Sequence, residues 1–472
     1  MLSRQVIRFL LLNKCCTRRA SGTALDFQDV PQPKGLPLVG TTFSLIAAGG
    51  PAKLHKYING RHEKLGPIFK DNVGPVTAVF LSDPDEMRAV FAKEGKYPIH
   101  IKPESWLIYN EKFGCSRGLF FMDGEEWLHF RRIMNKLLLK GNLSWIEDSC
   151  DVASQLFIDT IKANTKQELP NVEDSLYKWS LDVIVSILVG KRTYQQYHKE
   201  MEPLVQDLAA TIHLVFRTTS KMQLLPARLA EKYQLSRWKH FEKSVNDALG
   251  SAYKMLDYLQ SNFGETDGLL AKMIHEEVPK KELDRIVVDL ILGAGDTTAY
   301  SMAWILFAIS KYPEVQHEIR RQLRSDQNTP LLKNVVRETL RLYPVAPFLT
   351  RIIPEDVVLC GYTIPANTLI VMSIYTSGRS EKYFKNPNKF IPDRWLRNSS
   401  ANSNVIQQAS LPFGMGSRSC IGKKIAETQF QMTLRKVVEN FFVEIKNADQ
   451  IENVMQMVSK PSKPLKLIFN KI

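Results

Sequence analysis

The longest regular pattern in the chain is an apolar run of about thirty residues between Pro279 and Pro313. Apolar side chains recur along it at helical spacing, and the two prolines suit the start and the end of one helix. We therefore expect a helix about 45 Å long, enough to cross a whole domain. Its middle, Gly293–Thr298, reads Gly-Ala-Gly-Asp-Thr-Thr. These residues cost roughly 2 kcal/mol of helix propensity against alanine, which indicates either a functional site or a close contact with a crossing helix.

A second helical pattern begins at Lys423. Its apolar face has spacings of three and four and comprises Ala426, Phe430, Leu434, Val437 and Phe441. Directly before it, residues 413–422 read Phe-Gly-Met-Gly-Ser-Arg-Ser-Cys-Ile-Gly. The glycines allow a flat ligand to approach the backbone closely. Cys420 thus precedes a helix N-terminus, where free N–H groups and the helix dipole lower the pKa of a thiol. A single thiolate suits axial ligation of haem iron, whereas the alternative is a structural cysteine in a Gly-rich turn.

Shorter patterns predict a minor β-region near the N-terminus. An extended segment at 31–37 leads into a helix near 52–64. Residues 67–70 and 76–80 then have the composition of a β-hairpin. The following Asp83-Pro84 pair is typical of the start of a helix.

Residues 97–113 carry apolar side chains without a period, so we expect a loop there. It is either a pocket wall that includes Trp106 and Tyr109 or an ordinary packed loop. Further helices are expected at 125–139 and at 333–343, where Pro344 ends the second one.

The composition is that of one large domain. Of 472 residues, 44% are hydrophobic, and neither a Gly/Ser-rich nor a Pro-rich linker divides them. The six cysteines are too scattered for a disulfide framework or a zinc knuckle, which favours a reducing compartment. We therefore expect a mainly α domain over 25–472.

The first residues have the composition of a mitochondrial transit peptide, which we assign to 1–24. No acid precedes Asp26, and five cations alternate with apolar residues, namely Arg4, Arg8, Lys14, Arg18 and Arg19. A membrane anchor needs about twenty apolar residues in a row, whereas only Phe9–Leu12 are uninterrupted. A basic tail or a signal peptide is the alternative.

The formal net charge is +14, and the chain stays basic without the first residues. This charge favours an acidic partner or peripheral contact with an anionic membrane surface. No run of Lys and Arg is interleaved with aromatic residues, so nucleic acid is not an expected partner.

The segment before Lys423 resembles the haem-binding loop of the cytochrome P-450 monooxygenases. The matching residues are Phe413, Gly416, Arg418, Cys420 and Gly422. Gly293–Thr298 resembles the oxygen-activation motif of the same family, and the resemblance runs from about Val30 to the C-terminus. It implies the P-450 fold, with haem b (iron protoporphyrin IX) between the long central helix and the cysteine loop. Cys420 would then be the axial ligand of the haem iron.

The resemblance also implies roles on the distal side of the haem. Thr297 would steady dioxygen by hydrogen bonding, and Asp296 would relay protons from solvent. Ala294 stands where the family usually has glycine, which narrows the space above the haem.

Other residues match the groups that hold the haem propionates. Trp127 and Arg131 are four apart on one helix face and resemble the family's propionate clamp, to which Arg351 is similar in role. The expected substrate pocket comprises Trp106, Tyr109, Ala294, Val345 and Phe348.

Two groups on the predicted helix at 333–343 have different implied roles. Glu338 and Arg341 face each other, and with Arg394 they resemble the family's buried structural triad. Lys333 and Arg337 lie about 40° apart around the helix axis and are expected to point outward. Both resemble the cations that dock an acidic ferredoxin in the mitochondrial branch. Lys423 and Lys424 extend that face.

The resemblance to the mitochondrial branch implies a monooxygenase that receives electrons from NADPH indirectly, through a reductase and an adrenodoxin-type ferredoxin. Its location would be the matrix side of the inner mitochondrial membrane. Gly293–Ser301 and the link Arg324–Leu331 are most similar to arthropod ecdysteroid hydroxylases, with the 2-hydroxylase as the specific candidate. The expected substrate is therefore an apolar steroid.

Other functions stay open at this point. A xenobiotic-oxidising relative would keep the same motifs, because substrate choice depends on pocket residues. A haem-thiolate isomerase or dehydratase would need no external electrons, and a haem sensor would need no proton relay. Asp296, Thr297 and the basic face favour the monooxygenase.

Overall fold

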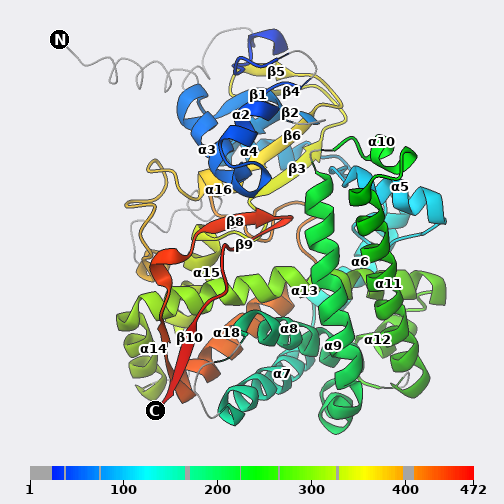
Figure 1. Ribbon diagram of the computed structural model, residues 1–472, viewed down its shortest axis with the longest axis vertical. Coiled ribbons are helices and arrows are strands. Elements are labelled where there is room, and N and C mark those ends of the chain that lie inside the picture. Colours follow the sequence, from blue (N-terminus) through cyan, green and yellow to red (C-terminus); the bar gives the residue numbers. More distant parts are fainter. Residues whose placement is uncertain are drawn as a thin grey trace.

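Long helices make up most of the protein, and a small β-region lies at one end (Figure 1). The computed structural model describes residues 24–36, 39–73, 76–164, 169, 171–223, 225–263, 266–325, 329–396 and 409–472. The predicted transit peptide therefore lies outside the described residues, except for Ala24.

The β-region contains a four-stranded sheet in the order β1 (Ile68–Val73), β2 (Val76–Leu81), β6 (Leu369–Ser373) and β3 (Phe348–Ile352). β1 and β2 pair in antiparallel register, as the predicted hairpin requires, with Phe69 opposite Phe80. β6 joins β2 in parallel and β3 in antiparallel register. Strands from residues 68–81 and 348–373 thus share one sheet, which is how a distant part of the chain is brought to the N-terminal region.

Short helices and a second hairpin complete the β-region, and they enclose apolar clusters separate from the main core. These elements are η1 (Phe27–Asp29), α2 (Thr42–Ala47), η2 (Pro51–Lys53), α3 (Leu54–Leu65), α4 (Pro84–Ala92), β4 (Val357–Leu359), β5 (Tyr362–Ile364) and α16 (Ile374–Ser377). As predicted, Asp83 precedes α4, and its side chain accepts a hydrogen bond from the Asp85 N–H.

The helical region has one continuous apolar core. Its helices are α5 (Glu104–Phe113), α6 (Gly124–Leu139), α7 (Ser144–Ala163), α8 (Val172–Val189), α9 (Lys191–Met222), α10 (Ala227–Lys232), α11 (Ser236–Phe263), α12 (Leu269–His275), α13 (Lys280–Lys311), α14 (Pro313–Ser325), α15 (Pro330–Leu342) and α18 (Lys423–Asn440). This arrangement confirms the mainly α prediction.

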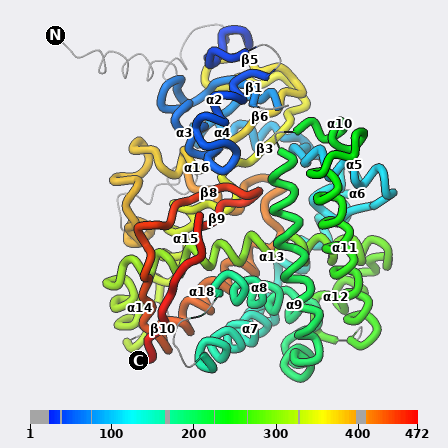
Figure 2. Tube along the Cα trace, in the orientation of Figure 1, coloured from blue at the N-terminus to red at the C-terminus, as the bar shows by residue number. Residues whose placement is uncertain are grey.

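The remaining elements lie towards the C-terminus. They are η3 (Pro392–Trp395), β7 (Phe441–Ile445), η4 (Ala448–Gln450), β8 (Asn453–Gln456), β9 (Val458–Pro461) and β10 (Leu467–Lys471). β7 pairs with β10, and β8 pairs with β9. β8 and β9 lie between the β-region and the helical region, and β9 contacts α13 (Figure 2).

α13 is the predicted long helix, and it is continuous from Lys280 to Lys311. It contacts α8, α9, α11, α15 and α18. Among the helices of the described ranges, it alone is long and apolar enough to cross a membrane, yet 78% of its most apolar window is buried in the protein, as in a core helix. A Cβ on Gly295 would lie 2.9 Å from Ile212 of α9, so the close contact between crossing helices is also present.

Two sequence predictions are wrong. Glu104–Phe113, expected as part of a loop, form α5, because Trp106 and Tyr109 both pack against Phe241 of α11 and stabilise a helix too short to show a clear period. Phe441, expected on the helix that follows Cys420, begins β7 instead, where it pairs with Lys471.

Candidate active site around Cys420

Cys420 lies in a tight loop immediately before α18, as predicted. The Cys420 N–H donates to the Phe413 carbonyl over 2.8 Å, which closes the loop. Gly414 and Gly416 have φ values of +71° and +76°, a conformation that residues with a side chain rarely adopt. A Cβ on Gly416 would also lie 2.3 Å from the Glu94 carboxylate. Glycine is therefore required at position 416, because the backbone has a positive φ and because Glu94 leaves no room for a Cβ.

Glu94 joins the cysteine loop to the β-region. One carboxylate oxygen accepts from the Ser417 N–H over 2.6 Å, and the other accepts from the Arg351 Nε over 2.6 Å. Arg351 in turn donates to the Met415 carbonyl over 3.2 Å. The predicted residue Arg351 thus lies beside the loop, paired with a carboxylate. No pattern in the sequence singles out Glu94, because its partners are on distant segments.

The two residues of the predicted clamp lie beside the same loop. Trp127 and Arg131 are both buried on α6. Arg131 donates from Nη2 to the Ser419 carbonyl over 2.6 Å, and the Arg418 guanidinium lies 4.1 Å from the centre of the Trp127 ring. The structure therefore brings Trp127, Arg131 and Arg418 together as the resemblance implies.

Arg418 occupies a pocket of backbone acceptors. It donates to the carbonyl oxygens of Pro98, Leu119 and Met122 and to the carboxylate of Asp123. Nearby, both ring nitrogens of His100 are buried without a hydrogen-bond partner. Burial, with Arg418, Lys102 and Arg351 close by, lowers the pKa of His100 to about 3. The space next to the loop is thus strongly cationic and includes unpaired donors or acceptors.

The Cys420 thiol departs from the electrostatic prediction. Its side chain is exposed, yet the surrounding protein removes enough water to raise the pKa of the thiol. A backbone hydrogen bond from Gly422, together with Arg131 and Lys423, acts in the opposite direction but does not outweigh that desolvation. The position before a helix therefore does not lower the pKa of this thiol, and a bound cation would favour the thiolate form.

α13 presents a short accessible strip in a mostly buried helix. Gly293 is exposed, and Ala294 and Thr297 are half-buried, so residues one turn apart are open on one face. The Thr297 hydroxyl donates to the Gly293 carbonyl over 2.6 Å. A flat ligand could lie against this strip, because two of the three residues carry no side chain beyond Cβ.

Asp296 directly precedes Thr297, but its side chain is buried against α8 and is not part of this strip. The Tyr177 hydroxyl donates to its Oδ1 over 2.5 Å, and His213 Nδ1 lies 3.0 Å from the same hydroxyl. Burial raises the pKa of Asp296 to about 8, although the Tyr177 hydrogen bond and Lys460 act against that shift. Asp296 is thus protonated in a substantial fraction of molecules near neutral pH.

The expected substrate-pocket residues are placed differently from one another. The Trp106 indole N–H donates to the Thr219 hydroxyl over 3.1 Å, and the Tyr109 hydroxyl donates to the Asn246 side-chain oxygen. Both side chains therefore lie where α5 packs against α9 and α11. Val345 is buried, and Phe348 is half-buried at the start of β3.

The predicted triad forms a closed cluster around Glu338. Arg341 donates twice to the Glu338 carboxylate, over 2.7 and 2.9 Å, and Arg394 donates once, over 2.9 Å. The Ile391 N–H and the Trp395 indole each donate over 2.9 Å as well. Five donors therefore compensate one fully buried carboxylate.

Three of the four cations of the predicted docking face, Lys333, Arg337 and Lys424, differ in their surroundings. Lys333 is exposed on α15, whereas Arg337 is half-buried with its guanidinium 6.0 Å from the centre of the Trp395 ring. Lys424 pairs with Glu147 over 3.6 Å. Lys333 is thus the most accessible of the three.

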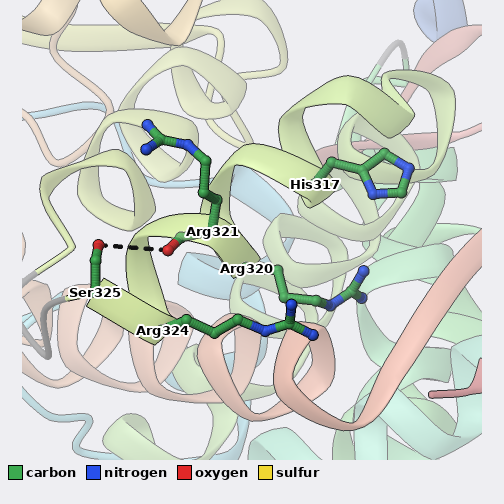
Figure 3. A pocket seen from close by; sticks show the side chains of 5 residues that line it. All are labelled: His317, Arg320, Arg321, Arg324 and Ser325. Atoms are coloured by element: carbon green, nitrogen blue, oxygen red, sulfur yellow. Dashed lines mark hydrogen bonds between the residues drawn. The ribbon is translucent and has the colours of Figure 1, made fainter.

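Two surface clefts lie among the described residues near these helices. One, of about 450 Å³, is lined by residues of α7, α8 and α9 that include Tyr177 and His213. The other, of about 390 Å³, is lined by His317, Arg320, Arg321, Arg324 and Ser325 of α14 (Figure 3). Arg320 donates to the carbonyls of Val438 and Phe441. None of the five lining residues belongs to the predicted site.

Comparison with known proteins shows which family this chain belongs to. The family model described as Cytochrome P450 matches residues 30–469. Cytochrome P450 315a1, mitochondrial, of Drosophila melanogaster is 36% identical over 96% of this chain and 90% of its own length. The mitochondrial cholesterol side-chain cleavage enzyme of Equus caballus is 27% identical over 95% of this chain and 90% of its own length.

A further relative is the mitochondrial 1,25-dihydroxyvitamin D(3) 24-hydroxylase of Mus musculus, 27% identical over 96% of this chain and 91% of its own length. Among solved structures, the retinoic acid-bound cyanobacterial CYP120A1 has a TM-score of 0.76 and 19% identity over 96% of this chain and all of that one, a similarity of fold. From the family match and the relatives together, the chain belongs to the cytochrome P450 family of monooxygenases.

Proposed function

We propose that this P450 is a mitochondrial steroid hydroxylase of the ecdysteroid type. The observation that carries the chemical part of the proposal is the exposed Cys420 thiol in a loop that is fixed by Arg131 and Glu94. A loop held from two sides keeps one sulfur in one place, which a metal ligand requires.

The residues around the loop fit haem, which the family implies. Haem carries two propionates, and Arg131, Arg351, Arg418 and the unpaired ring of His100 gather in one cationic space. The desolvated thiol fits as well, because an iron ion would supply further positive charge beside Cys420, where Arg131 and Lys423 alone do not outweigh desolvation. Haem bound there would supply activation of dioxygen.

The residues of α13 then have separate tasks. The accessible Thr297 hydroxyl would hold a hydrogen bond next to the reacting oxygen, with Gly293 and Ala294 leaving room beside it. Asp296 would hold a proton on Oδ1 or Oδ2 and release it towards Thr297, for which a pKa near neutral is favourable. The Glu338, Arg341 and Arg394 cluster has only a structural task, because it is fully enclosed.

Electrons would reach the protein from NADPH through ferredoxin reductase and an adrenodoxin-type ferredoxin. Support comes from the exposed Lys333 and from the positive net charge that the chain keeps without residues 1–24, both of which attract an acidic partner. The mitochondrial names of the relatives support a mitochondrial location for this chain. The matrix side of the inner membrane is part of the proposal because the ferredoxin partner implied by the resemblance is expected there.

A steroid substrate is supported by two relatives whose names give cholesterol and a vitamin D derivative as their substrates. The ecdysteroid assignment, with 2-hydroxylation as the specific reaction, rests on the sequence of Gly293–Ser301 and of the link after α14. The alternative is a mitochondrial P450 that oxidises xenobiotics, and these two segments favour the ecdysteroid hydroxylase over it.

Reconstitution tests the proposal. The purified protein is combined with ferredoxin, ferredoxin reductase and NADPH and is offered a steroid panel that includes a 2-deoxyecdysteroid. The expected result is a spectral shift on steroid binding and a 2-hydroxylated product. Turnover of planar xenobiotics but of no steroid would exclude the steroid assignment, and product formation without NADPH would favour an isomerase.

A further inference from the structure

Three polar groups from three helices form a continuous path through the protein. Asp296 of α13, Tyr177 of α8 and His213 of α9 are joined by contacts of 2.5 and 3.0 Å. α8, α9 and α13 contact one another pairwise, and all three are visible in the lower half of Figure 1. Because Tyr177 and His213 also line the cleft of about 450 Å³, the path connects buried Asp296 with the surface.

We propose that Tyr177 and His213 are the proton entry of this enzyme and pass protons from the cleft between α8 and α9 to Asp296. The inference rests on the proposed function of Asp296 as the proton donor. It adds the residues that recharge Asp296 after each transfer.

The reaction of a monooxygenase requires such a supply. Each turnover takes one dioxygen molecule, two electrons and two protons, places one oxygen atom in the product and releases the other as water. The electrons come from NADPH, and at least one proton must come from solvent. Asp296 is buried, so a proton that leaves it must be replaced through its neighbours.

The hydrogen-bond directions make the transfer possible. Tyr177 has one hydroxyl proton, and when it donates that proton to the Asp296 carboxylate, His213 Nδ1–H is the donor to the Tyr177 oxygen. His213 takes up a proton from the cleft at Nε2 as its Nδ1 proton moves to the Tyr177 oxygen and the Tyr177 proton moves to the Asp296 carboxylate. The imidazole ring thus changes tautomer, and it stays neutral throughout. Bonds formed and broken are all O–H or N–H, and no oxidant is needed.

Burial and the charged groups around the path favour the neutral forms of His213 and Asp296. Burial lowers the pKa of His213, Lys460 of β9 and Arg217 of α9 lower it further, and Asp174 of α8 acts in the opposite direction. Asp296 is faced by Tyr177 and Glu173 of α8 and by Lys460. Tyr300, on the same helix as Asp296, stacks edge-on against Tyr177 and accepts from Lys460 over 3.2 Å. A neutral chain can pass a proton without leaving a buried charge behind.

A matched substitution separates a relay from simple packing. Tyr177→Phe removes only the hydroxyl. His213→Phe keeps an aromatic ring against Tyr177, where the ring centres are 5.2 Å apart. The control is Tyr194→Phe, because Tyr194 also donates to a buried aspartate of the same cleft, Asp182, over 2.7 Å, and Asp182 lies on α8 rather than on α13.

Three readouts are taken on the reconstituted protein with a 2-deoxyecdysteroid: product formed per NADPH consumed, hydrogen peroxide released, and the solvent deuterium isotope effect. We expect Tyr177→Phe to lower product per NADPH by about threefold or more, with more peroxide and a larger isotope effect. His213→Phe should change all three in the same direction, and Tyr194→Phe should leave them unchanged. Product formation driven by added hydrogen peroxide, which brings its own protons, should survive in Tyr177→Phe.

An infrared measurement needs no turnover. The band of the protonated Asp296 carboxyl, identified by its loss in Asp296→Asn, should move to higher frequency in Tyr177→Phe, because that carboxyl loses a hydrogen bond. An unmoved band, unchanged coupling in Tyr177→Phe, or an equal loss in Tyr194→Phe would overturn the relay. If Asp296→Asn itself leaves coupling unchanged, the proposed role of Asp296 fails. If Asp296→Asn alone lowers coupling, only the relay fails.

Discussion

Arg131 donates a hydrogen bond of 2.6 Å to the carbonyl of Ser419, so a residue of α6 fixes the peptide that comes directly before Cys420. Its neighbour Arg132 is exposed on the same helix. We expect Arg131→Lys to weaken haem retention by about tenfold, because a lysine cannot keep both the Ser419 contact and the second contact to Asn135. The haem-to-protein ratio after gel filtration measures this, with Arg132→Lys as the control. Equal retention in the two variants would contradict the role of Arg131.

Cys420→Ser tests the ligand itself. A serine hydroxyl is not an anionic sulfur donor, so the carbonyl complex of the reduced variant should lack the absorption typical of thiolate ligation. Cys150→Ser is the matched control, because Cys150 is a buried cysteine on α7 and not part of the loop at 413–422. A thiolate-type spectrum that persisted in Cys420→Ser would exclude Cys420 as the ligand.

Glu338→Ala should destabilise the protein by about 3–5 kcal/mol, because it leaves Arg341 and Arg394 buried without their carboxylate. Glu318→Ala is the control, since Glu318 also pairs with an arginine three residues away, Arg321, but on the surface of α14. It should not change the unfolding midpoint measurably. The measurement is the urea concentration at the unfolding midpoint of each variant. Similar midpoints for Glu338→Ala and Glu318→Ala would show that the cluster around Glu338 is dispensable.

Features that depend on neighbouring residues could be predicted from the sequence. The length of α13 follows from its two flanking prolines, and the start of α4 follows from Asp83 and Pro84, both of which act within a few residues. The loop around Cys420 has several glycines at fixed spacing, so its position before α18 was also predictable.

Features that depend on distant contacts could not be predicted. α5 owes its stability to Phe241 of α11, which the sequence of Glu104–Phe113 does not reveal. Glu94 and Tyr177 have no local signal, since their partners Ser417 and Asp296 are 323 and 119 residues away. The pKa of Cys420 depends on the balance between burial and nearby charge, and that balance is set partly by Arg131, which is far from Cys420 along the chain.

The pH dependence of stability should carry a contribution from Asp296. Burial raises its pKa from 3.8 to about 8, so between these values the folded protein binds a proton that the unfolded chain has released. The contribution of Asp296 to stability is therefore lost as pH rises through this window, by about 1 kcal/mol per pH unit. Asp296→Asn should gain stability relative to wild type as pH rises from about 5 to about 7, measured by urea unfolding. A constant difference across that range would show that the carboxyl is not protonated on folding.

Charge reversal on α15 tests the docking face. Lys333→Glu combined with Arg337→Glu should raise the KM for ferredoxin at least about tenfold and weaken its dependence on salt, because an acidic partner is repelled. Arg237→Glu combined with Lys239→Glu reverses one arginine and one lysine that are exposed on α11, and it should leave the KM unchanged. Unaltered reduction by ferredoxin in the α15 variant would exclude this surface.

The contacts around Cys420 also set the order in which the protein can mature. The loop at 413–422 is fixed by Glu94 and Arg131, which are 323 and 288 residues away from their partners, Ser417 and Ser419, along the chain. Such long-range contacts form late, because the intervening chain must first be ordered. The helical region and the β-region therefore have to dock on each other before the cysteine has its final surroundings. Cofactor insertion is thus expected as one of the last steps of assembly, after the C-terminal part of the chain has been made.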